Sequence, residues 1–180
     1  SVTMGGQELR GELQRITELV NSVLRTTRLM ARGLTPVRPG NDGLLEGFEE
    51  LTQHIFDRFG VQVGLEVELP AQVELDENTA SNLYRIAQEG MLNAARHAHA
   101  TNINVSLAVE DRLVALTIRD DGRGFDPYSV RGGGMGLRVM RFRAQMISGY
   151  LLVESQPGEG TLLRCRCPLR PEMASIEREE

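Results

Sequence analysis

The chain has 180 residues, 41% of them hydrophobic, which is enough for one domain with a full core and an appended segment, but not for a second complete domain. With 25 acidic against 20 basic residues the net charge is -5, and no Lys/Arg block marks a nucleic-acid surface, so we expect no nucleic-acid partner. No apolar run approaches the roughly 20 residues that span a bilayer, and no signal-peptide pattern is present, so we expect a cytoplasmic module whose parent protein is free to be membrane-anchored.

The first predicted element is an amphipathic helix over 7–30. Its apolar residues recur three and four positions apart, at Leu9, Leu13, Ile16, Val20, Val23 and Met30. The helix is predicted to end near Gly33, and the turn-forming cluster at 39–43 marks a domain boundary. We therefore expect a helical segment with a linker over 1–40 and a domain over 41–170. The acidic stretch after it, 171–180, is predicted to be disordered.

A second helix is predicted over 44–59, begun by Asn41 or Asp42 as its cap and stopped by Gly60. Strict alternation of apolar residues then predicts a half-buried strand over 61–69.

The longest helix is predicted over 76–98, because acidic residues stand at its start and basic ones at its end. Alternating segments predict strands at 103–109, 114–118 and 162–168, and a strand at 150–154 is expected to pair with the last of these around the turn at 156–160. A further helix is expected at 137–147. Hairpins with helices between them indicate an α+β fold, a two-layer sandwich of helices on a mostly antiparallel sheet. Cys165 and Cys167 share one face of the last strand and are expected to be reduced thiols packed as small apolar groups.

Polar residues recur four positions apart on the helix predicted over 76–98. Glu89, Asn93 and His97 therefore lie on one helix face. An amide oxygen suits Mg²⁺ while leaving room for phosphate oxygens, and a carboxylate can orient a water or accept a proton. The alternative is an ordinary polar face turned to solvent.

Three glycine-containing segments follow. At 120–125, Asp120 ends a strand, where its carboxylate can accept the exocyclic amine of adenine, and the glycines let the backbone approach the flat base. At 132–136, glycines lead into a helix whose N–H groups form an anion site. At 158–161, two glycines and Thr161 connect the last strands. Taken singly, the first segment is equally well an acidic turn, whereas a flexible linker is the simpler explanation of the second and a hairpin turn that of the third.

Together and in this order, the four segments resemble the N, G1, G2 and G3 boxes of the ATPase superfamily shared by gyrase, the ninety-kilodalton heat-shock chaperone, histidine kinases and mismatch-repair ATPases. The run Leu83-Tyr84-Arg85-Ile86-Ala87-Gln88-Glu89 with Asn93 and His97, and later Asp120-Asp121-Gly122-Arg123-Gly124-Phe125, resembles the nitrate-sensor subfamily of histidine kinases. The resemblance covers about 43–169 and implies a Bergerat-type ATP-binding fold. A Walker-type glycine loop is absent from the sequence.

The resemblance implies a role for each matching residue. Asn93 would bind Mg²⁺, Glu89 would be the base or water-orienting residue, and Asp120 would contact adenine. The remaining binding residues implied are those near the phosphates, in the pocket and its lid, and on the adenine side: Arg96, His97, Gly122, Gly124, Gly132, Gly134, Gly136 and Thr161.

The segment 12–37 resembles the second helix of the subfamily's dimerisation domain. The first helix, with its phosphoacceptor histidine, is not matched, because none of His54, His97 and His99 stands in that motif. Phe142 departs from the subfamily, which commonly has Glu there, and the methionines at 135, 140 and 146 are expected to be packing residues.

The resemblance therefore implies the catalytic domain of a histidine kinase that binds Mg²⁺ and ATP. Its implied partners are the dimerisation domain of the same kinase, within a homodimer, and a response regulator. Two alternatives stay open. An anti-sigma-factor serine kinase shares the boxes but begins directly with the catalytic domain, and a non-enzymatic regulatory module would bind nucleotide as a structural switch.

Overall fold

A computed structural model describes residues 40–127 and 134–169, which all belong to one compact unit. The predicted helix over 7–30, the linker up to residue 39, Gly132 and the tail over 171–180 lie outside the described residues. The elements in chain order are α2 (Asn41–Phe59), β1 (Gln62–Glu68), α3 (Glu77–Asn93), the short π-helix η1 (Ala94–Ala98), β2 (Asn102–Glu110), β3 (Leu113–Asp120), α4 (Met135–Met146), β4 (Tyr150–Ser155) and β5 (Thr161–Pro168).

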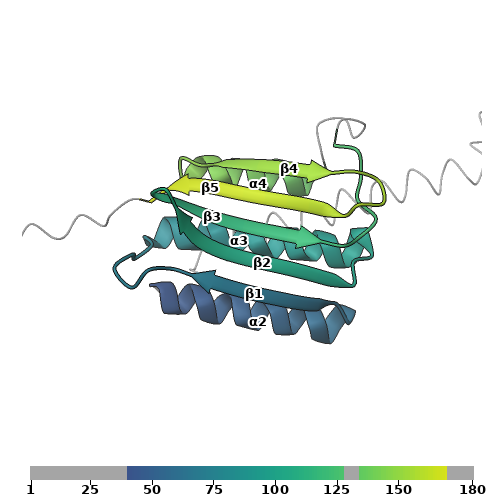
Figure 1. Ribbon diagram of the computed structural model, residues 1–180, viewed down its shortest axis with the longest axis horizontal. Coiled ribbons are helices and arrows are strands. Elements are labelled where there is room, and N and C mark those ends of the chain that lie inside the picture. The colour runs from purple at the N-terminus through teal and green to yellow at the C-terminus, as the bar shows by residue number, and fades with distance from the viewer. Residues whose placement is uncertain (1–39, 128–133, 170–180) are drawn as a thin grey trace, which may run out of the picture. The chain divides into compact units, whose positions relative to one another are not determined.

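Within the described residues, the strands form one five-stranded sheet in the order β1-β2-β3-β5-β4. Only β1 and β2 run parallel, since α3 and η1 connect them as a crossover, and the other neighbours are antiparallel. Figure 1 shows α2, α3 and α4 side by side behind one face of this sheet. The predicted α+β sandwich of helices on a mostly antiparallel sheet is confirmed.

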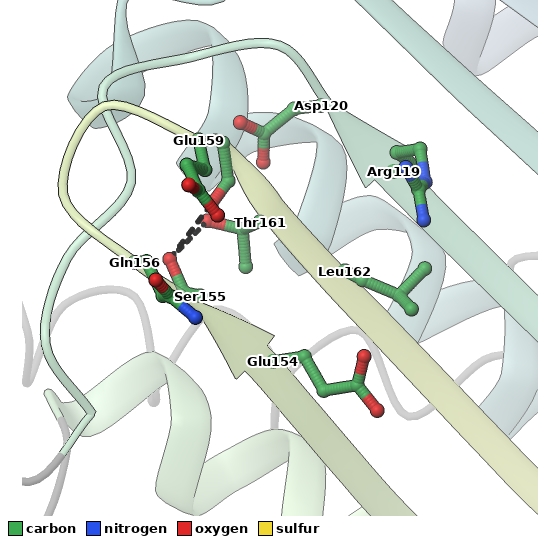
Figure 2. Close-up of a pocket in the computed structure, with 9 residues that line it drawn as sticks. Arg119, Asp120, Glu154, Ser155, Gln156, Glu159, Thr161 and Leu162 are labelled. Atoms are coloured by element: carbon green, nitrogen blue, oxygen red, sulfur yellow. Dashed lines mark hydrogen bonds between the residues drawn. The ribbon is translucent and has the colours of Figure 1, made fainter.

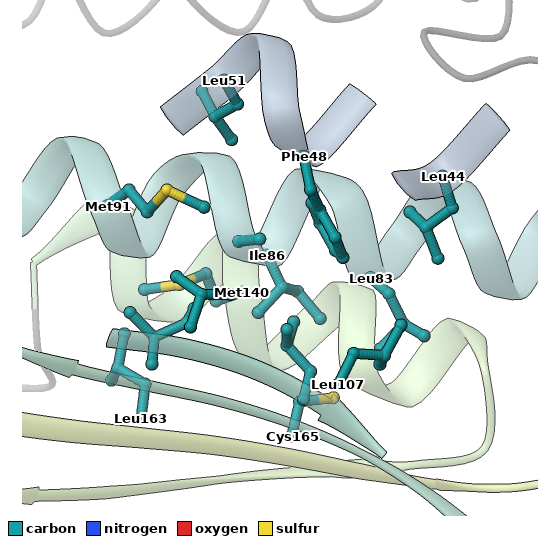
Figure 3. Packing of buried hydrophobic residues seen from close by; sticks show 14 of the residues in the cluster. Leu44, Phe48, Leu51, Leu83, Ile86, Met91, Leu107, Met140, Leu163 and Cys165 are labelled. Carbon is teal, nitrogen blue, oxygen red and sulfur yellow. The ribbon is translucent and has the colours of Figure 1, made fainter. Parts of the chain in front are cut away.

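The core fills the space between the two layers, as Figure 3 shows. Its largest fully buried side chains come from all three helices and the middle strands: Leu44, Phe48, Ile55, Leu83, Ile86, Met91, Ile103, Leu107, Leu116, Ile118, Met140 and Ile147. Removing each from water stabilises the fold by roughly 1.5–3 kcal/mol. Close packing of α3 on the sheet depends on Gly90, where a Cβ would come within 2.8 Å of Ile118 Cδ1.

Both cysteines lie in this core as free thiols, as predicted. Burial raises the pKa of Cys165 to about 12, so that thiol is neutral at physiological pH. The methionine prediction is right for Met140 alone, since Met135 and Met146 are exposed on α4. Phe142 is also exposed, with 62% of its surface accessible.

The start of α2 differs from the prediction. The helix begins at Asn41, and its N-cap is Gly40, which has no side chain to cap it. The side chain of Asn41 instead bonds to the segment before α3, donating to the carbonyl of Val73 and accepting from the N–H of Leu75 at 3.2 Å. The predicted stop is confirmed, because Gly60 ends the helix in the left-handed conformation with a φ of 70°.

Candidate functional site

Two candidate residues lie opposite each other where β3 ends and β5 begins. Asp120 and Thr161 are register partners in the antiparallel pair. The Asp120 side chain is nearly buried, with 9% of its residue surface accessible, and it accepts a hydrogen bond from the N–H of Gly122 at 2.9 Å. Burial raises the pKa of Asp120, although hydrogen bonds from Gly122 and Thr161 oppose the shift by favouring the carboxylate. The result is a shielded acceptor at the end of the central strand β3.

Glycines hold the backbone close around this carboxylate. A Cβ on Gly122 would meet Ala98, and a Cβ on Gly124 would come within 2.8 Å of the Gly160 carbonyl oxygen. Gly124 and Gly160 also have positive φ angles of 58° and 74°, which favour glycine. Gly160 packs against the carbonyl of Asp120. The loops after β3 and before β5 are therefore in direct backbone contact.

The same region connects to the long helix through η1. The N–H of Arg123 donates to the carbonyl of Ala98 at 2.8 Å. Since α3 gives way to a π-helix at Ala94, the spacing of four no longer keeps His97 in a strict row with Glu89 and Asn93. The prediction of one regular helix over 76–98 therefore needs correcting at its last turn. π-helical turns occur frequently at functional sites.

A second group of candidates meets at the beginning of α4. A Cβ at Gly136 would overlap Oε1 of Glu89 and come within 3.1 Å of Nδ2 of Asn93. Gly134 is the N-cap of α4 and offers no side chain to its first turn. The N–H groups of that turn have no partner inside the helix and favour an anion. A carboxylate, an amide and a helix N-terminus are thus brought together by α3 and α4.

Two predicted phosphate neighbours lie at the end of α3 with exposed side chains. His97 is in η1, and the guanidinium of Arg96 lies over the ring of Phe59, 5.7 Å from its centroid. Arg96 therefore contacts Phe59 at the end of α2.

Figure 2 shows a pocket of about 200 Å³ at the ends of β3, β4 and β5. Residues of both sheet faces and of the turn between β4 and β5 line it: Arg119, Asp120, Glu154, Ser155, Gln156, Glu159, Gly160, Thr161 and Leu162. Glu89, Asn93 and Gly136 do not line this pocket. The described candidates thus form two groups, one around Asp120 and one around Glu89. Gly122, of the first group, lies against Ala98 in the π-helix that continues α3.

The sequence analysis did not identify two residues whose hydrogen bonds connect the segments around Asp120. Ser155, at the end of β4, hydrogen bonds to the loop after β3 and to the turn before β5. Asp121 accepts hydrogen bonds from the backbone and side chains of Thr101 and Asn102, at 2.7–2.9 Å, which lowers its pKa far below the usual range. In the sequence, the position of Asp121 directly after Asp120 could have indicated a role for it. Nothing in the sequence around Ser155 indicated its contacts beyond its place at the end of a predicted strand.

Comparison with known proteins decides the family. The model of the histidine kinase-, DNA gyrase B- and HSP90-like ATPases matches residues 78–171, which include both groups of candidate residues. The chain belongs to this ATPase family. The superfamily resemblance found in the four boxes is therefore confirmed, and the domain is of the ATP-binding type that this family shares.

The sensor histidine kinase LiaS of Bacillus subtilis is 29% identical over 161 residues, which are 89% of this chain and 44% of LiaS. The chain thus spans less than half the length of this curated relative. Two solved structures share the fold. The histidine kinase AdeS of Acinetobacter baumannii matches with a TM-score of 0.62 and 18% identity over 94% of this chain and 87% of that one. The histidine kinase domain of the blue-light activated kinase of Erythrobacter litoralis EL346 matches with a TM-score of 0.57 and 23% identity over 67% and 58%.

Among residues 40–127 and 134–169, no helix has the length and apolar character needed to cross a membrane.

Proposed function

We propose that this chain supplies the catalytic domain of a sensor histidine kinase of the nitrate-sensor type. The domain binds ATP with Mg²⁺ and presents the γ-phosphoryl group to a histidine on the dimerisation domain of a homodimeric, cytoplasmic kinase region. A response regulator then receives the phosphoryl group. The observation that carries the proposal is that one matched ATPase domain contains both the Asp120 group and the Glu89 group, the latter against the first turn of α4.

In this proposal the adenine ring of ATP binds where β3 ends. The Asp120 carboxylate accepts the exocyclic amine of adenine, Thr161 completes that side, and the glycines at 122 and 124 admit the flat ring. A hydrogen bond to a charged, shielded group contributes roughly 1.5–3 kcal/mol, which is enough to distinguish an amine from a carbonyl at that position. The hydrogen bond from Gly122 supports this role, since it favours the ionised, accepting form of Asp120.

In this proposal the phosphates of ATP lie beside the Glu89 group, which Glu89, Asn93 and Gly136 form. The side chains of Asn93 and Glu89 converge on the first turn of α4, a donor set that fits Mg²⁺, which prefers oxygen ligands and keeps room for phosphate oxygens and water. Asn93 would hold the ion, and a bound Mg²⁺ would neutralise charge on the transferred phosphoryl group. Glu89 would orient or deprotonate the attacking group, and the α4 N–H groups with Gly132 and Gly134 would bind phosphate. Arg96 and His97 would approach from η1.

Two other functions compete with this one. An anti-sigma-factor serine kinase would transfer the phosphoryl group to a serine, and the similarity of 12–37 to a dimerisation helix favours the histidine kinase instead. A purely regulatory nucleotide switch would not need a carboxylate beside the magnesium ligand. Glu89 lies against Gly136 in the first turn of α4, the proposed phosphate site, and this supports an enzyme.

Phosphotransfer from labelled ATP tests the proposal. The chain should phosphorylate a separately supplied dimerisation domain of a related kinase on histidine, giving acid-labile and alkali-stable label, and Glu89→Ala should abolish the transfer while ATP still binds. Acid-stable label on serine would support the anti-sigma alternative. ATP binding with no transfer to any acceptor would support the regulatory module.

A further inference from the structure

Polar side chains connect α3 and α4 at a second place, outside the four ATPase boxes. Arg143, in the last turn of α4, donates from Nη1 to Oδ1 of Asn82 on α3 at 3.3 Å. The amide of Asn78, also on α3, donates to the carbonyl of Met146 at 3.4 Å. Met146 is the last residue of α4, where carbonyls have no partner inside the helix. The first turns of α3 are thus hydrogen bonded to the end of α4.

The Asn82 amide is held in one orientation. Asn82 is buried, and its Nδ2 donates to the backbone carbonyl of Asn78 at 2.8 Å and to Oδ1 of Asn78 at 2.9 Å. An amide nitrogen has two hydrogens, so both are used. The remaining Oδ1 of Asn82 can only accept, and a guanidinium, which only donates, is a matching partner. Arg143 therefore contacts a buried acceptor whose position is set by α3.

The same two helices meet at the candidate site, where Gly136 lies against Glu89. Asn82 and Glu89 are seven residues apart on α3, and Gly136 and Arg143 are seven apart on α4, so each pair lies on one face of its helix. The beginning of each helix contacts the end of the other, so the two run antiparallel. A helix rises about 1.5 Å per residue, so a shift of α4 by one residue along α3 would break both contacts.

The charge of Arg143 extends to the same face. Burial lowers the pKa of Arg143 and nearby Arg85 lowers it further, whereas the Glu89 carboxylate opposes both by favouring the charged form. Arg143 thus interacts electrostatically with the carboxylate that Gly136 contacts.

We propose that Arg143 is a positioning residue for nucleotide binding, whose hydrogen bond to Asn82 holds α4 along α3 so that its first turn stays against Glu89. This inference rests on the proposed binding of phosphates at that turn. Without the bond α4 loses an attachment two turns away from Gly136, and its first N–H groups are held less firmly beside Glu89 and Asn93.

Calorimetric titration of the chain with ATP and Mg²⁺ tests this inference. Arg143→Met keeps an unbranched apolar stem and removes the donor. A net hydrogen bond corresponds to about a two- to tenfold change in an equilibrium constant, so Arg143→Met should weaken ATP binding by that factor. Gly136→Ala already displaces the contact through which Arg143 acts. In that background Arg143→Met should therefore weaken binding by no more than about twofold further.

The matched control is Arg141→Met, which makes the same substitution at an exposed position of α4 and should bind ATP normally. Thermal unfolding of every variant establishes that it is folded. If Arg143→Met does not fold, Asn82→Ala removes the same hydrogen bond from α3 and has the same expectations in both backgrounds.

The outcomes separate this inference from the function on which it rests. Unchanged affinity in folded Arg143→Met, or an equal loss of affinity with and without Gly136→Ala, would overturn the positioning role of Arg143. If Asp120→Ala weakens ATP binding in the same series, the proposed function stands without that role. If Asp120→Ala also binds ATP normally, the proposed function itself is wrong.

Discussion

Gly136, in the first turn of α4, lies directly against the carboxylate of Glu89 on α3. Any β-carbon at position 136 would overlap Glu89 Oε1 and crowd the amide of Asn93. A side chain at position 136 therefore requires the Glu89 carboxylate to move, and the close approach brings the helix N-terminus onto the polar residues of α3. Position 134, two residues earlier, has open space around an added β-carbon.

Because of this contact, Gly136→Ala should affect ATP binding and leave the stability of the fold nearly unchanged. The added methyl has to displace Glu89 or the start of α4, so ATP affinity should fall by at least about tenfold, while thermal stability changes little because the contact lies outside the core. Gly134→Ala is the comparison, and it should weaken binding less. Equal affinities for the two variants, measured by calorimetry, would show that the Gly136 contact has no part in binding.

Asn93→Ala should reduce the contribution of Mg²⁺ to ATP binding without unfolding the domain. The amide is on the half-buried face of α3, and its removal leaves the apolar contacts of that helix intact. The measurement is the ATP affinity with Mg²⁺ and with excess chelator. The difference between the two should shrink in Asn93→Ala and persist in Asn104→Ala, which removes an exposed amide from β2. A difference preserved in Asn93→Ala would mean that Asn93 is not a ligand.

Asp121 should make the fold sensitive to acid. Its hydrogen bonds with Thr101 and Asn102 lower its pKa in the folded state below the unfolded value of about 3.9. A depressed folded pKa stabilises the protein above the unfolded pKa, and that stabilisation disappears as the pH falls below about 4 toward the folded pKa. The drop in melting temperature between pH 7 and pH 3 should therefore be smaller in Asp121→Asn than in the unchanged chain. An equal drop in the two proteins would show that Asp121 does not contribute.

The chain should bind ATP without phosphorylating itself on histidine. Transfer needs an acceptor in line with the γ-phosphate, and none of the three histidines stands in a phosphoacceptor motif. His54 lies on α2, His97 lies in η1, and His99 forms the C-cap after it. Incubation with γ-labelled ATP should give no acid-labile, alkali-stable label. Stoichiometric label that disappears when one of these histidines is replaced would identify an unexpected acceptor.

Much of the fold follows from local patterns. Alternation of apolar residues, and for 150–154 the turn that follows it, located all five strands to within about two residues, because a sheet covered on one face imposes a period of two on its side chains. Asp120 was correctly placed at a strand end, since polar residues interrupt the alternation there. The end of α2 at Gly60 was also predicted correctly, because the left-handed backbone conformation that ends a helix depends on local geometry, which glycine favours.

The remaining features depend on contacts between distant parts of the chain. Asn41 is of a residue type that often caps helices, yet its side chain hydrogen bonds to residues more than thirty positions away. No local sequence pattern reveals those bonds. The π-helical turn at Ala94–Ala98 and the stacking of Arg96 on Phe59 also arise from packing of α3 against its neighbours. Ser155 stands in an ordinary alternating strand, so only the folded structure shows that it contacts Phe125.

The proposed function depends above all on recognition of adenine by Asp120, which the ATP affinity of Asp120→Ala tests. Loss of a hydrogen bond to a charged group, roughly 1.5–3 kcal/mol, should weaken binding by at least about tenfold. Asp57→Ala removes an exposed carboxylate from α2 and serves as the control, with unchanged affinity expected. A folded Asp120→Ala protein that binds ATP as tightly as the unchanged chain would show that Asp120 does not recognise adenine.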